Sequence, residues 1–463
     1  MMCLLWWKTM SKVLILDLEN KKIEYQSVSR MKKGLYLGYE LYDKFCSKDD
    51  LVVVRGALSG LLPGACHSYV VYYKPLLKTL SYAIVSGTLG GIIYSSDLEA
   101  IVIKGGFPGK SLYSIIIDKE EISFNPSGEL AAFDYQQMKN VAEKKAVSPY
   151  DVVFFSGNSV SQNIFSNISI TGNELLNGDG LGALFLKKNI RMIHISGRET
   201  QIPSYLKKEY FTLIKKMKHN VSGVFERTCY GCPNHCFFFR STMNRLSIKH
   251  IIYRKYIEIF NKCFNKEGRE NPDRFFYIFD IFSVDFMAIM PVIKYLFSRE
   301  DLSREMGIRV DNNLQYKDVV LFLKNLNVDN NKFYNLLRSD MDLFKIDYKA
   351  EIIRHGNSFA INTEEDDNLV KLDFYHPSIF DTPDLPYMNV LKLKALYEML
   401  GICPNLHYTY DEYWLSKIGE KTHDSFREID RLELFGNALL NYKYEMEKKH
   451  SEKLRKVYPG EEE

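Results

Sequence analysis

The sequence predicts an α+β protein in which a β-rich N-terminal domain is followed by mainly helical domains. Runs of β-branched residues, punctuated by glycine and proline, fill residues 10–125. A strand, a glycine-rich turn into a helix, and a second strand are indicated next, and helical periodicity dominates after residue 205. A chain of 463 residues is long enough for two or three domains. We expect these to span residues 10–205, 206–300 and 301–463.

The predicted strands follow one another closely in the N-terminal part. The segment "KVLILDLENKKIEY" indicates two strands joined by a turn that contains asparagine. Further strands are expected in "LVVVRGALSGLLPG", "SYVVYYK", "EAIVIKGG" and "LYSIIIDKEEISF". The strand–turn–helix–strand block reads "DVVFFSG", "NGDGLGALFLKK" and "IRMIHISG". Helices are predicted over residues 205–220, 272–298, 316–338 and 388–401.

Composition and charge narrow the class of protein. Hydrophobic residues make up 46% and charged residues 26%, as in a globular protein, and the net charge of +3 does not favour a nucleic-acid partner. The stretch "TLSYAIVSGTLGGIIYSS" is too polar to span a membrane. The N-terminal "MMCLLWWK" lacks the basic region and cleavage site of a signal peptide, and Met10 is a candidate start of the chain. We therefore expect a cytoplasmic protein with no membrane span.

The cysteines give the strongest chemical signal. Without a secretion signal, the eight cysteines of the chain are expected to be thiols or metal ligands. Cys229, Cys232 and Cys236 have a C-x2-C-x3-C spacing, and Cys403 follows Gly401 at the predicted end of a helix. A [4Fe–4S] cluster needs about four converging thiolates, which such a loop and one distant cysteine can supply.

Two alternatives to the cluster stay open from the residues alone. One is a zinc site formed by the three clustered cysteines with His235 or Cys403. The other is a set of thiols without any ligand. The remaining cysteines, which show no metal spacing, are expected to be buried or incidental thiols: Cys3, Cys46, Cys66 and Cys263.

Several segments resemble, in the same order, the tungsten-dependent aldehyde:ferredoxin oxidoreductases. The similar segments include the opening hairpin, "RGALSGLLPGACHSYVVYYKP", "SGTLGGIIYSSDLEAIVIKGG" and "NGDGLGALFLKKNIRMIHISG". They continue with "CYGCPNHC", "ALYEMLGIC" and "LFGNALLNYKYE". The resemblance covers residues 12–240, 275–295 and 388–445, and its most specific part is the cysteine pattern with its remote partner.

The resemblance implies cofactors and residues that hold them. Family members place a [4Fe–4S] cluster near a tungsten or molybdenum bis-pterin and oxidise aldehydes, with electrons leaving to ferredoxin. Cys229, Cys232, Cys236 and Cys403 are implied as cluster ligands. A ferredoxin-like carrier or a redox partner subunit is the implied electron partner. The implied pterin-binding residues are Ser86, Gly87, Gly180, Gly182, Asp280, Asp285 and Glu398.

Departures from the family pattern concern the pterin and the substrate. Ser68 stands where the family has an arginine between cluster and pterin. Glu174 and Asp179 lie in the glycine-rich segment, where the family carries arginines suited to a phosphate. The family's Gly-Gly-Cys-His stretch has no counterpart, and His355 and His376 are unsupported by any motif. The sequence thus leaves open an active oxidoreductase or an iron–sulfur protein that relays electrons or supports a partner without its own pterin. A third alternative is a cluster or zinc that only joins domains.

Overall fold

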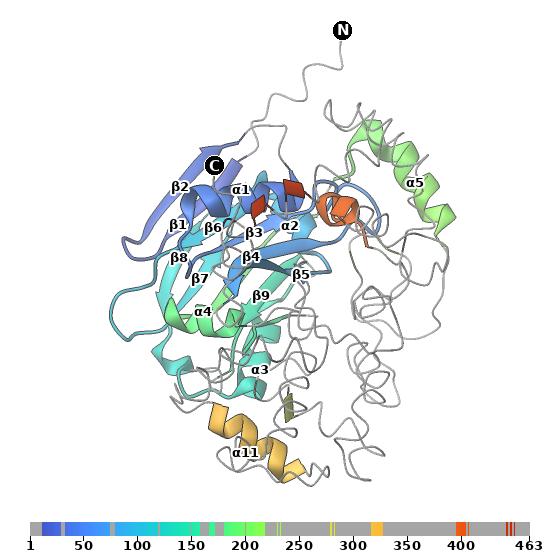
Figure 1. Cartoon of the computed structure of the whole chain (residues 1–463). Coiled ribbons are helices and arrows are strands. Elements are labelled where there is room, and N and C mark those ends of the chain that lie inside the picture. The colour runs from blue at the N-terminus through green and yellow to red at the C-terminus, as the bar shows by residue number, and fades with distance from the viewer. Residues whose placement is uncertain are drawn as a thin grey trace, which may run out of the picture.

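The structure is a computed structural model, and its described part contains the N-terminal β-rich region and several later segments. Two mixed β-sheets with helices on their faces are seen in this part (Figure 1). The main described ranges are residues 12–28, 33–74, 79–118, 121–148, 150–157, 166–171, 180–199, 201–217, 316–326 and 395–403. Short described pieces follow at residues 229, 232, 278–279, 282, 406, 441–442, 445–446 and 449.

The first sheet has six strands in the order β2-β1-β6-β3-β4-β5. β1 and β6 are parallel, while every other neighbouring pair in this sheet is antiparallel. In the turn between β1 and β2, Asp17 accepts hydrogen bonds from the backbone and side-chain nitrogens of Asn20, both 3.1 Å long. The strands are β1 (Lys12–Asp17), β2 (Lys22–Ser27), β3 (Leu51–Arg55), β4 (Ser68–Lys74), β5 (Thr79–Val85) and β6 (Leu98–Lys104).

The second sheet has five strands in the order β10-β9-β11-β7-β8. Its central pair, β11 and β7, is parallel, and the other pairs are antiparallel. Arg191 of β11 is fully buried and donates to the carbonyls of Leu130 and Phe133 at 3.2 and 2.5 Å. The strands are β7 (Tyr113–Ile117), β8 (Ile122–Pro126), β9 (Asp151–Phe155), β10 (Ser169–Ile170) and β11 (Ile190–Ser196).

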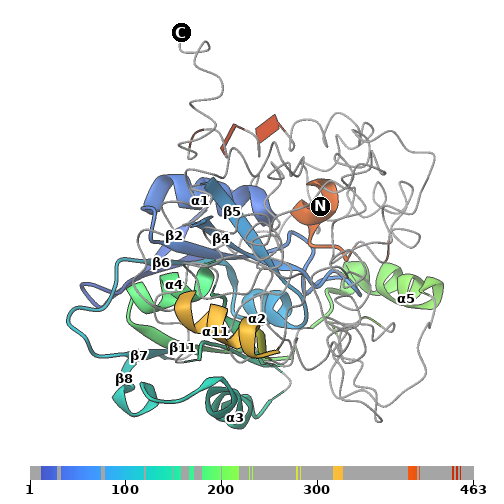
Figure 2. The ribbon, with the colours of Figure 1, turned by 60° about the horizontal axis from the view of Figure 1, so that its bottom comes forward.

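Helices cover the outer faces of the sheets and contribute to the core between them (Figure 2). Helix α1 (Gly34–Phe45) packs on the outer face of the first sheet, and α3 (Tyr135–Lys145) packs on that of the second. Side chains of α2 (Leu89–Ser95) and α4 (Leu181–Lys187) share one core with inward-facing residues of both sheets. The other described helical segments are Gly128–Leu130, Ser204–Leu206, α5 (Lys207–Lys216) and α11 (Tyr316–Leu326).

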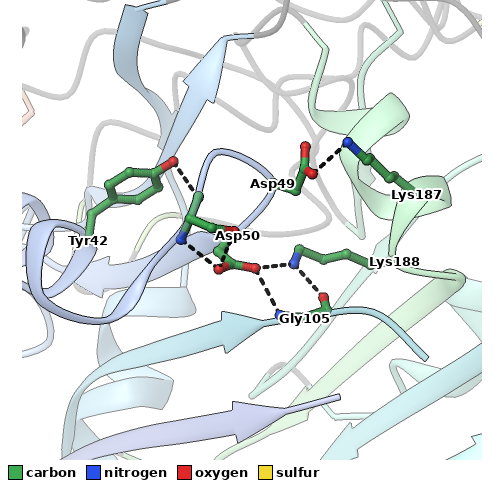
Figure 3. Close-up of polar contacts among 7 residues, drawn as sticks. Tyr42, Asp49, Asp50, Gly105, Lys187 and Lys188 are labelled. Atoms are coloured by element: carbon green, nitrogen blue, oxygen red, sulfur yellow. Dashed lines mark hydrogen bonds and ion pairs between the residues drawn. The ribbon is translucent and has the colours of Figure 1, made fainter. Parts of the chain in front are cut away.

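A buried ion pair joins the two sheets at one end of β3 (Figure 3). Lys188, directly after α4, donates to Asp50 and to the carbonyl of Gly105, and both distances are 2.6 Å. Asp50, directly before β3, also accepts from the Gly105 backbone at 2.9 Å and twice from Ser47. Burial lowers the pKa of Lys188, while the nearby Asp50 opposes that shift. Both carboxylate oxygens of the buried Asp50 thus accept hydrogen bonds, Oδ1 from Lys188 and Gly105 and Oδ2 from Ser47.

The predicted N-terminal strands are confirmed, and the helices among them are an addition. Each quoted strand segment forms a strand, and the glycine-rich turn leads into α4 as predicted. The sequence did not predict α1, α2 and α3, of which α1 buries Tyr39 and Tyr42 against the first sheet. Most of the predicted domains 206–300 and 301–463 and of the helix 272–298 lie outside the described residues. No helix of the described part is long and apolar enough to cross a membrane.

Candidate functional site

The candidate site lies where the loop after β3 meets a helix end from the C-terminal part of the chain (Figure 1). The described helical residues 395–400 end at Gly401, whose φ is +76°. Ala65 and Ile402 form an isolated antiparallel bridge between the two segments. Four backbone hydrogen bonds add to it, from Ala57 to Met399 (3.0 Å), Leu58 to Leu400 (2.8 Å), His67 to Gly401 (3.0 Å) and Cys403 to Gly64 (3.1 Å).

Two glycines make this close approach possible. A Cβ atom on Gly401 would lie 2.7 Å from the Cα of Gly56 and 2.8 Å from the carbonyl oxygen of His67. That carbonyl already accepts from the Gly56 backbone at 3.1 Å and from the Ser59 hydroxyl at 2.5 Å. A side chain at position 401 would therefore push apart the two segments that set the position of Cys403.

Three of the four predicted cluster ligands are buried in one apolar cluster. Cys229, Cys232 and Cys403 are 5%, 8% and 4% exposed and belong to the same group of packed side chains. None of the three forms a disulfide within the described residues, and the Cys232 backbone donates to the Cys229 carbonyl at 3.0 Å. The fourth predicted ligand, Cys236, lies outside the described residues. Apolar neighbours in the same cluster include Leu62, Leu206, Leu213, Met217 and Leu400.

Cys66, which the sequence predicts to be a buried or incidental thiol, is a further buried cysteine in this cluster. It is 1% exposed and follows Ala65, the partner of Ile402 in the bridge. Among the described residues, no three His, Cys, Asp or Glu side chains are arranged to hold a metal ion by themselves. The buried thiols are soft ligands of the kind that iron and zinc take. They are called the buried-cysteine set below and comprise Cys66, Cys229, Cys232 and Cys403.

Burial raises the pKa of two tyrosines, Tyr69 and Tyr210, and cysteines of the buried-cysteine set raise each pKa further. Tyr69 of β4 is fully buried, and the carboxylate of Glu398 and the thiols of Cys66 and Cys403 raise its pKa further. Tyr210 of α5 responds in the same direction to burial and to Cys232.

Glu398, predicted as a pterin-binding acid, contacts a tyrosine of the first sheet. Glu398 is 5% exposed, and its carboxylate accepts a hydrogen bond from the hydroxyl of Tyr82 in β5. The rings of Tyr82 and Tyr69 pack edge to face, with centroids 5.7 Å apart. This contact anchors the helix end that precedes Cys403 to the sheet.

Arg55, the last residue of β3, orders the loop that carries Cys66. Its guanidinium donates to Glu99 of β6 at 2.9 Å and to the carbonyls of Ala57 and Ser59, both at 3.1 Å. Glu99 also pairs with Lys33. Although burial alone raises the pKa of Glu99, the charges of Arg55 and Lys33 hold that pKa below its ordinary value.

The first predicted pterin segment packs tightly against the same loop. Ser86 is buried and Gly87 has φ +111°, between β5 and α2. A Cβ on Gly90 of α2 would lie 2.5 Å from the Cβ of Ser59 and 3.1 Å from the hydroxyl of Ser68. Ser68, which stands at the family's arginine position, is fully buried. The glycine thus serves close packing between α2 and the loop.

The second predicted pterin segment is only partly described. Gly180, with φ +83°, precedes α4, and the Gly182 backbone donates to the Ser166 carbonyl at 3.1 Å. Residues flanking both segments, Val85 and Leu89 on one side and Leu181 on the other, belong to the core between the sheets. The positions outside the described residues are Glu174, Gly178, Asp179, Asp280, Asp285, His235, His355 and His376.

Sequence reasoning missed Tyr69, Tyr82 and Cys66 as neighbours of the site. A signal was present for Tyr69, because the predicted strand "SYVVYYK" holds tyrosines at positions that are buried in a covered sheet. Tyr82 lies in β5, which the sequence did not predict as a strand. A buried tyrosine hydroxyl usually has a hydrogen-bond partner, which directs attention to the polar groups nearby.

The chain is similar to a known protein family in part of its sequence and to a solved structure in its fold. Residues 13–197 match the family described as aldehyde ferredoxin oxidoreductase, N-terminal domain. A solved structure described as "Active site complex BamBC of Benzoyl Coenzyme A reductase in complex with 1,5 Dienoyl-CoA" is similar in fold, with a TM-score of 0.66. The sequences are 13% identical, and the match covers 97% of this chain and 94% of that chain. No curated protein matches the sequence.

Proposed function

We propose that this chain is an iron–sulfur redox protein, on the basis that residues 13–197 match the aldehyde ferredoxin oxidoreductase N-terminal domain. Its [4Fe–4S] cluster is held by Cys229, Cys232, Cys236 and Cys403. When bound, the cluster stores and releases single electrons. The chain exchanges these electrons with a ferredoxin-type carrier or with a partner subunit.

The observation that carries the proposal is the burial of Cys229, Cys232 and Cys403 in one cluster. Two of these cysteines lie on one loop, while the third comes from a helix end that backbone hydrogen bonds attach to the loop after β3. Their surroundings are largely apolar, and such surroundings control solvent access and the potential of a cluster. The thiols fit a cluster in their chemistry and burial, and Cys236 completes the set by its spacing.

The relay function without a pterin of its own is the form of the proposal that the described residues favour. Glu398, the acid implied for a pterin, already accepts from Tyr82. Ser68 has a neutral hydroxyl where the resemblance implies the guanidinium of an arginine. The guanidinium of Arg55 already donates hydrogen bonds to Glu99 and to the carbonyls of the loop after β3. These groups hold the loop and the helix end together, and they leave the cluster as the redox group of the chain.

A partner that takes or supplies electrons is part of the proposal. The similar solved structure is described as an active site complex, BamBC, of benzoyl coenzyme A reductase with 1,5 dienoyl-CoA. We propose that this chain likewise works beside a second redox protein. The competing hypothesis is that this chain itself oxidises aldehydes with a tungsten or molybdenum bis-pterin.

The test is a metal count on protein purified without oxygen. We expect about four irons per chain, as a [4Fe–4S] cluster requires, with neither tungsten nor molybdenum in stoichiometric amount and no reduction of viologen dye by aldehydes. Stoichiometric tungsten or molybdenum with aldehyde turnover would establish the competing enzyme. Zinc in place of iron would exclude both redox functions.

A further inference from the structure

Helix α5 has one side in the apolar cluster that holds the buried cysteines and the other side in solvent. Leu206, Leu213 and Met217, in or next to α5, belong to that cluster. A Cβ on Gly64 would lie 3.4 Å from the side chain of Met217, so the end of α5 meets the loop that leads to Cys66. In both views α5 lies at one side of the described part, away from the two sheets (Figure 1, Figure 2). The width of one helix with its side chains, about 10–12 Å, thus separates the exposed side of α5 from the cluster.

The exposed side of α5 is basic and has an aromatic ring at its centre. Lys207, Lys208 and Lys215 are exposed, and Phe211 is 56% exposed. Lys207, Phe211 and Lys215 recur at every fourth position, so they form one row along the helix. Glu209, the only acidic residue of α5, is 2% exposed. The exposed side therefore carries positive charge with no carboxylate of the same helix beside it.

The stability of the helix does not account for all of this charge. The helix dipole stabilises cations in the last turn and disfavours them in the first. Lys215 agrees with this rule, whereas Lys207 and Lys208 are the first two residues of α5. The ten residues of α5 include four lysines and one glutamate, a net charge of +3 that equals the charge of the whole chain. Attraction of an oppositely charged partner does account for such a concentration.

Phe211 supplies the apolar part of the same surface. Its ring packs edge to face on Tyr210, with ring centroids 5.7 Å apart, and Tyr210 is 8% exposed. The exposed ring is therefore held in place before a partner arrives, which lowers the entropy cost of binding. Protein interfaces commonly surround an aromatic centre with a polar or charged rim. An aromatic ring between lysines, one helix away from a proposed cluster, fits a protein that exchanges electrons.

We propose that the exposed side of α5 docks the electron carrier, an acidic iron–sulfur protein of the ferredoxin type. This inference rests on the proposed function, because it requires a cluster among the buried cysteines. The lysines attract carboxylates of the carrier, and Phe211 contacts apolar surface beside the carrier's redox centre. One electron passes between the two clusters, so that one is reduced as the other is oxidised and no bond forms or breaks.

The experiment compares two triple variants of the full chain, purified without oxygen. The test variant neutralises the exposed lysines of α5: Lys207→Gln, Lys208→Gln and Lys215→Gln. The control neutralises three exposed lysines elsewhere and so changes the net charge equally: Lys110→Gln, Lys144→Gln and Lys145→Gln. Stopped-flow absorption measures the second-order rate constant of electron exchange with an acidic [2Fe–2S] ferredoxin, and iron per chain is determined for each protein.

The expected effect of the α5 lysines depends on salt. At about 10 mM salt, where the Debye length is about 30 Å, the rate constant should fall about tenfold in the α5 variant and under about twofold in the control. At about 1 M salt the wild type and both variants should converge. Phe211→Ala should lower the rate constant about fivefold at both salt concentrations, because its contact is apolar. Tyr25→Ala, which removes a 58% exposed ring from β2, should leave it unchanged.

The outcomes distinguish this inference from the proposed function. Wild-type protein without a four-iron cluster would overturn both. With a full cluster, equal rate constants for the α5 variant and its control would overturn the docking surface alone. If the α5 variant loses iron, the Phe211→Ala and Tyr25→Ala pair decides, and equal rate constants for that pair overturn the inference. Binding to anionic lipid vesicles that the α5 variant loses, with ferredoxin exchange unchanged, would assign this side of α5 to a membrane and would also overturn it.

Discussion

The two ends of strand β3 carry buried polar groups of contrasting character. At its start, Asp50 accepts four hydrogen bonds, from Lys188, Gly105 and twice from Ser47. At its other end, the loop after Arg55 leads to Cys66, Ser68 and Tyr69, where the hydroxyls of Ser68 and Tyr69 lack partners within the described residues. The carboxylate at the first end has all its hydrogen-bond partners, whereas the hydroxyls at the second end, which follow Cys66 in the sequence, have none among the described residues.

This difference separates a structural ion pair from a candidate binding site. Saturated buried charges hold elements in register, and here they join the sheets through the residues that flank β3, β6 and α4. A buried polar group without a partner in a native protein calls for an explanation, and a bound ligand or a catalytic role is one of them. At the second end, the terminal nitrogens of the Arg55 guanidinium bind Glu99 and the carbonyls of Ala57 and Ser59, and they order the loop that leads to Cys66.

The largest effect is expected from Cys232→Ser, compared with Cys66→Ser. Both variants remove a buried thiol from the buried-cysteine set, but only Cys232 belongs to the C-x2-C-x3-C pattern. We expect Cys232→Ser to lose nearly all iron and visible absorption, because serine is a poor ligand for a cluster, whereas Cys66→Ser should keep both. Iron analysis and absorption spectra of anaerobic protein measure this. The reverse result would make Cys66 the ligand and exclude Cys232.

The saturated end of β3 is tested by Lys188→Met, with Lys187→Met as its neighbour control. Lys188 is buried against Asp50, whereas the side chain of Lys187 is 62% exposed in its 2.5 Å pair with Asp49. Removing one partner of a buried pair costs about 3–5 kcal/mol of unfolding free energy, while the exposed pair contributes under about 1 kcal/mol. Denaturant unfolding measures both. Equal losses in the two variants would mean that the buried pair does not stabilise the fold.

Gly401→Ala tests how the helix end is attached to the loop, and Gly109→Ala is the matched control. Both glycines have a positive φ, +76° and +80°, but a Cβ at Gly109 would meet no atom within 4 Å. Strain in the left-handed region costs about 1–2 kcal/mol for either, and overpacking adds about 1–3 kcal/mol at position 401 only. We expect Gly401→Ala also to lower the iron content. Normal iron with matched stabilities would contradict the role of this contact.

The sequence was sufficient for the strands because their β-branched runs are local signals. "LVVVR" and "EAIVIK" form β3 and β6 as their composition predicts. Helix α1 was missed because "GLYLGYELYDKF" contains two glycines and three tyrosines, which have no strong helical preference. Its helical state depends on packing against the first sheet, a contact that local preference does not encode.

The candidate site shows the same division between local and long-range information. The spacing of Cys229 and Cys232 indicates a ligand loop by itself, and the helix end before Cys403 indicates where a distant thiol is presented. The approach of Tyr69, Tyr82 and Cys66 depends on strand order and on the contact between Ala65 and Ile402. No local pattern specifies which residues such a contact brings together.

The last prediction concerns how the stability contributed by the Arg55–Glu99 pair depends on pH, tested by Glu99→Gln. The charges of Arg55 and Lys33 overcome burial and lower the pKa of Glu99. The folded state therefore binds this proton less readily than the unfolded chain. The pair contributes its full stability above the unfolded pKa of about 4.3 and loses it as the pH falls through the folded pKa.

Glu99→Gln removes this titration while keeping the size of the side chain. At pH 7 we expect the variant to be less stable than the wild type, because Arg55 and Lys33 lose the charge that they share. Below about pH 4.3 the difference should shrink, because the unfolded wild-type chain takes up a proton at Glu99 while the folded protein does not, until the pH falls through the folded pKa. Glu143→Gln, at an exposed position of α3, is the control and should follow the wild type throughout. Unfolding free energies between pH 3 and 7 measure the difference, and a gap independent of pH would show that Glu99 does not remain ionised in the folded protein.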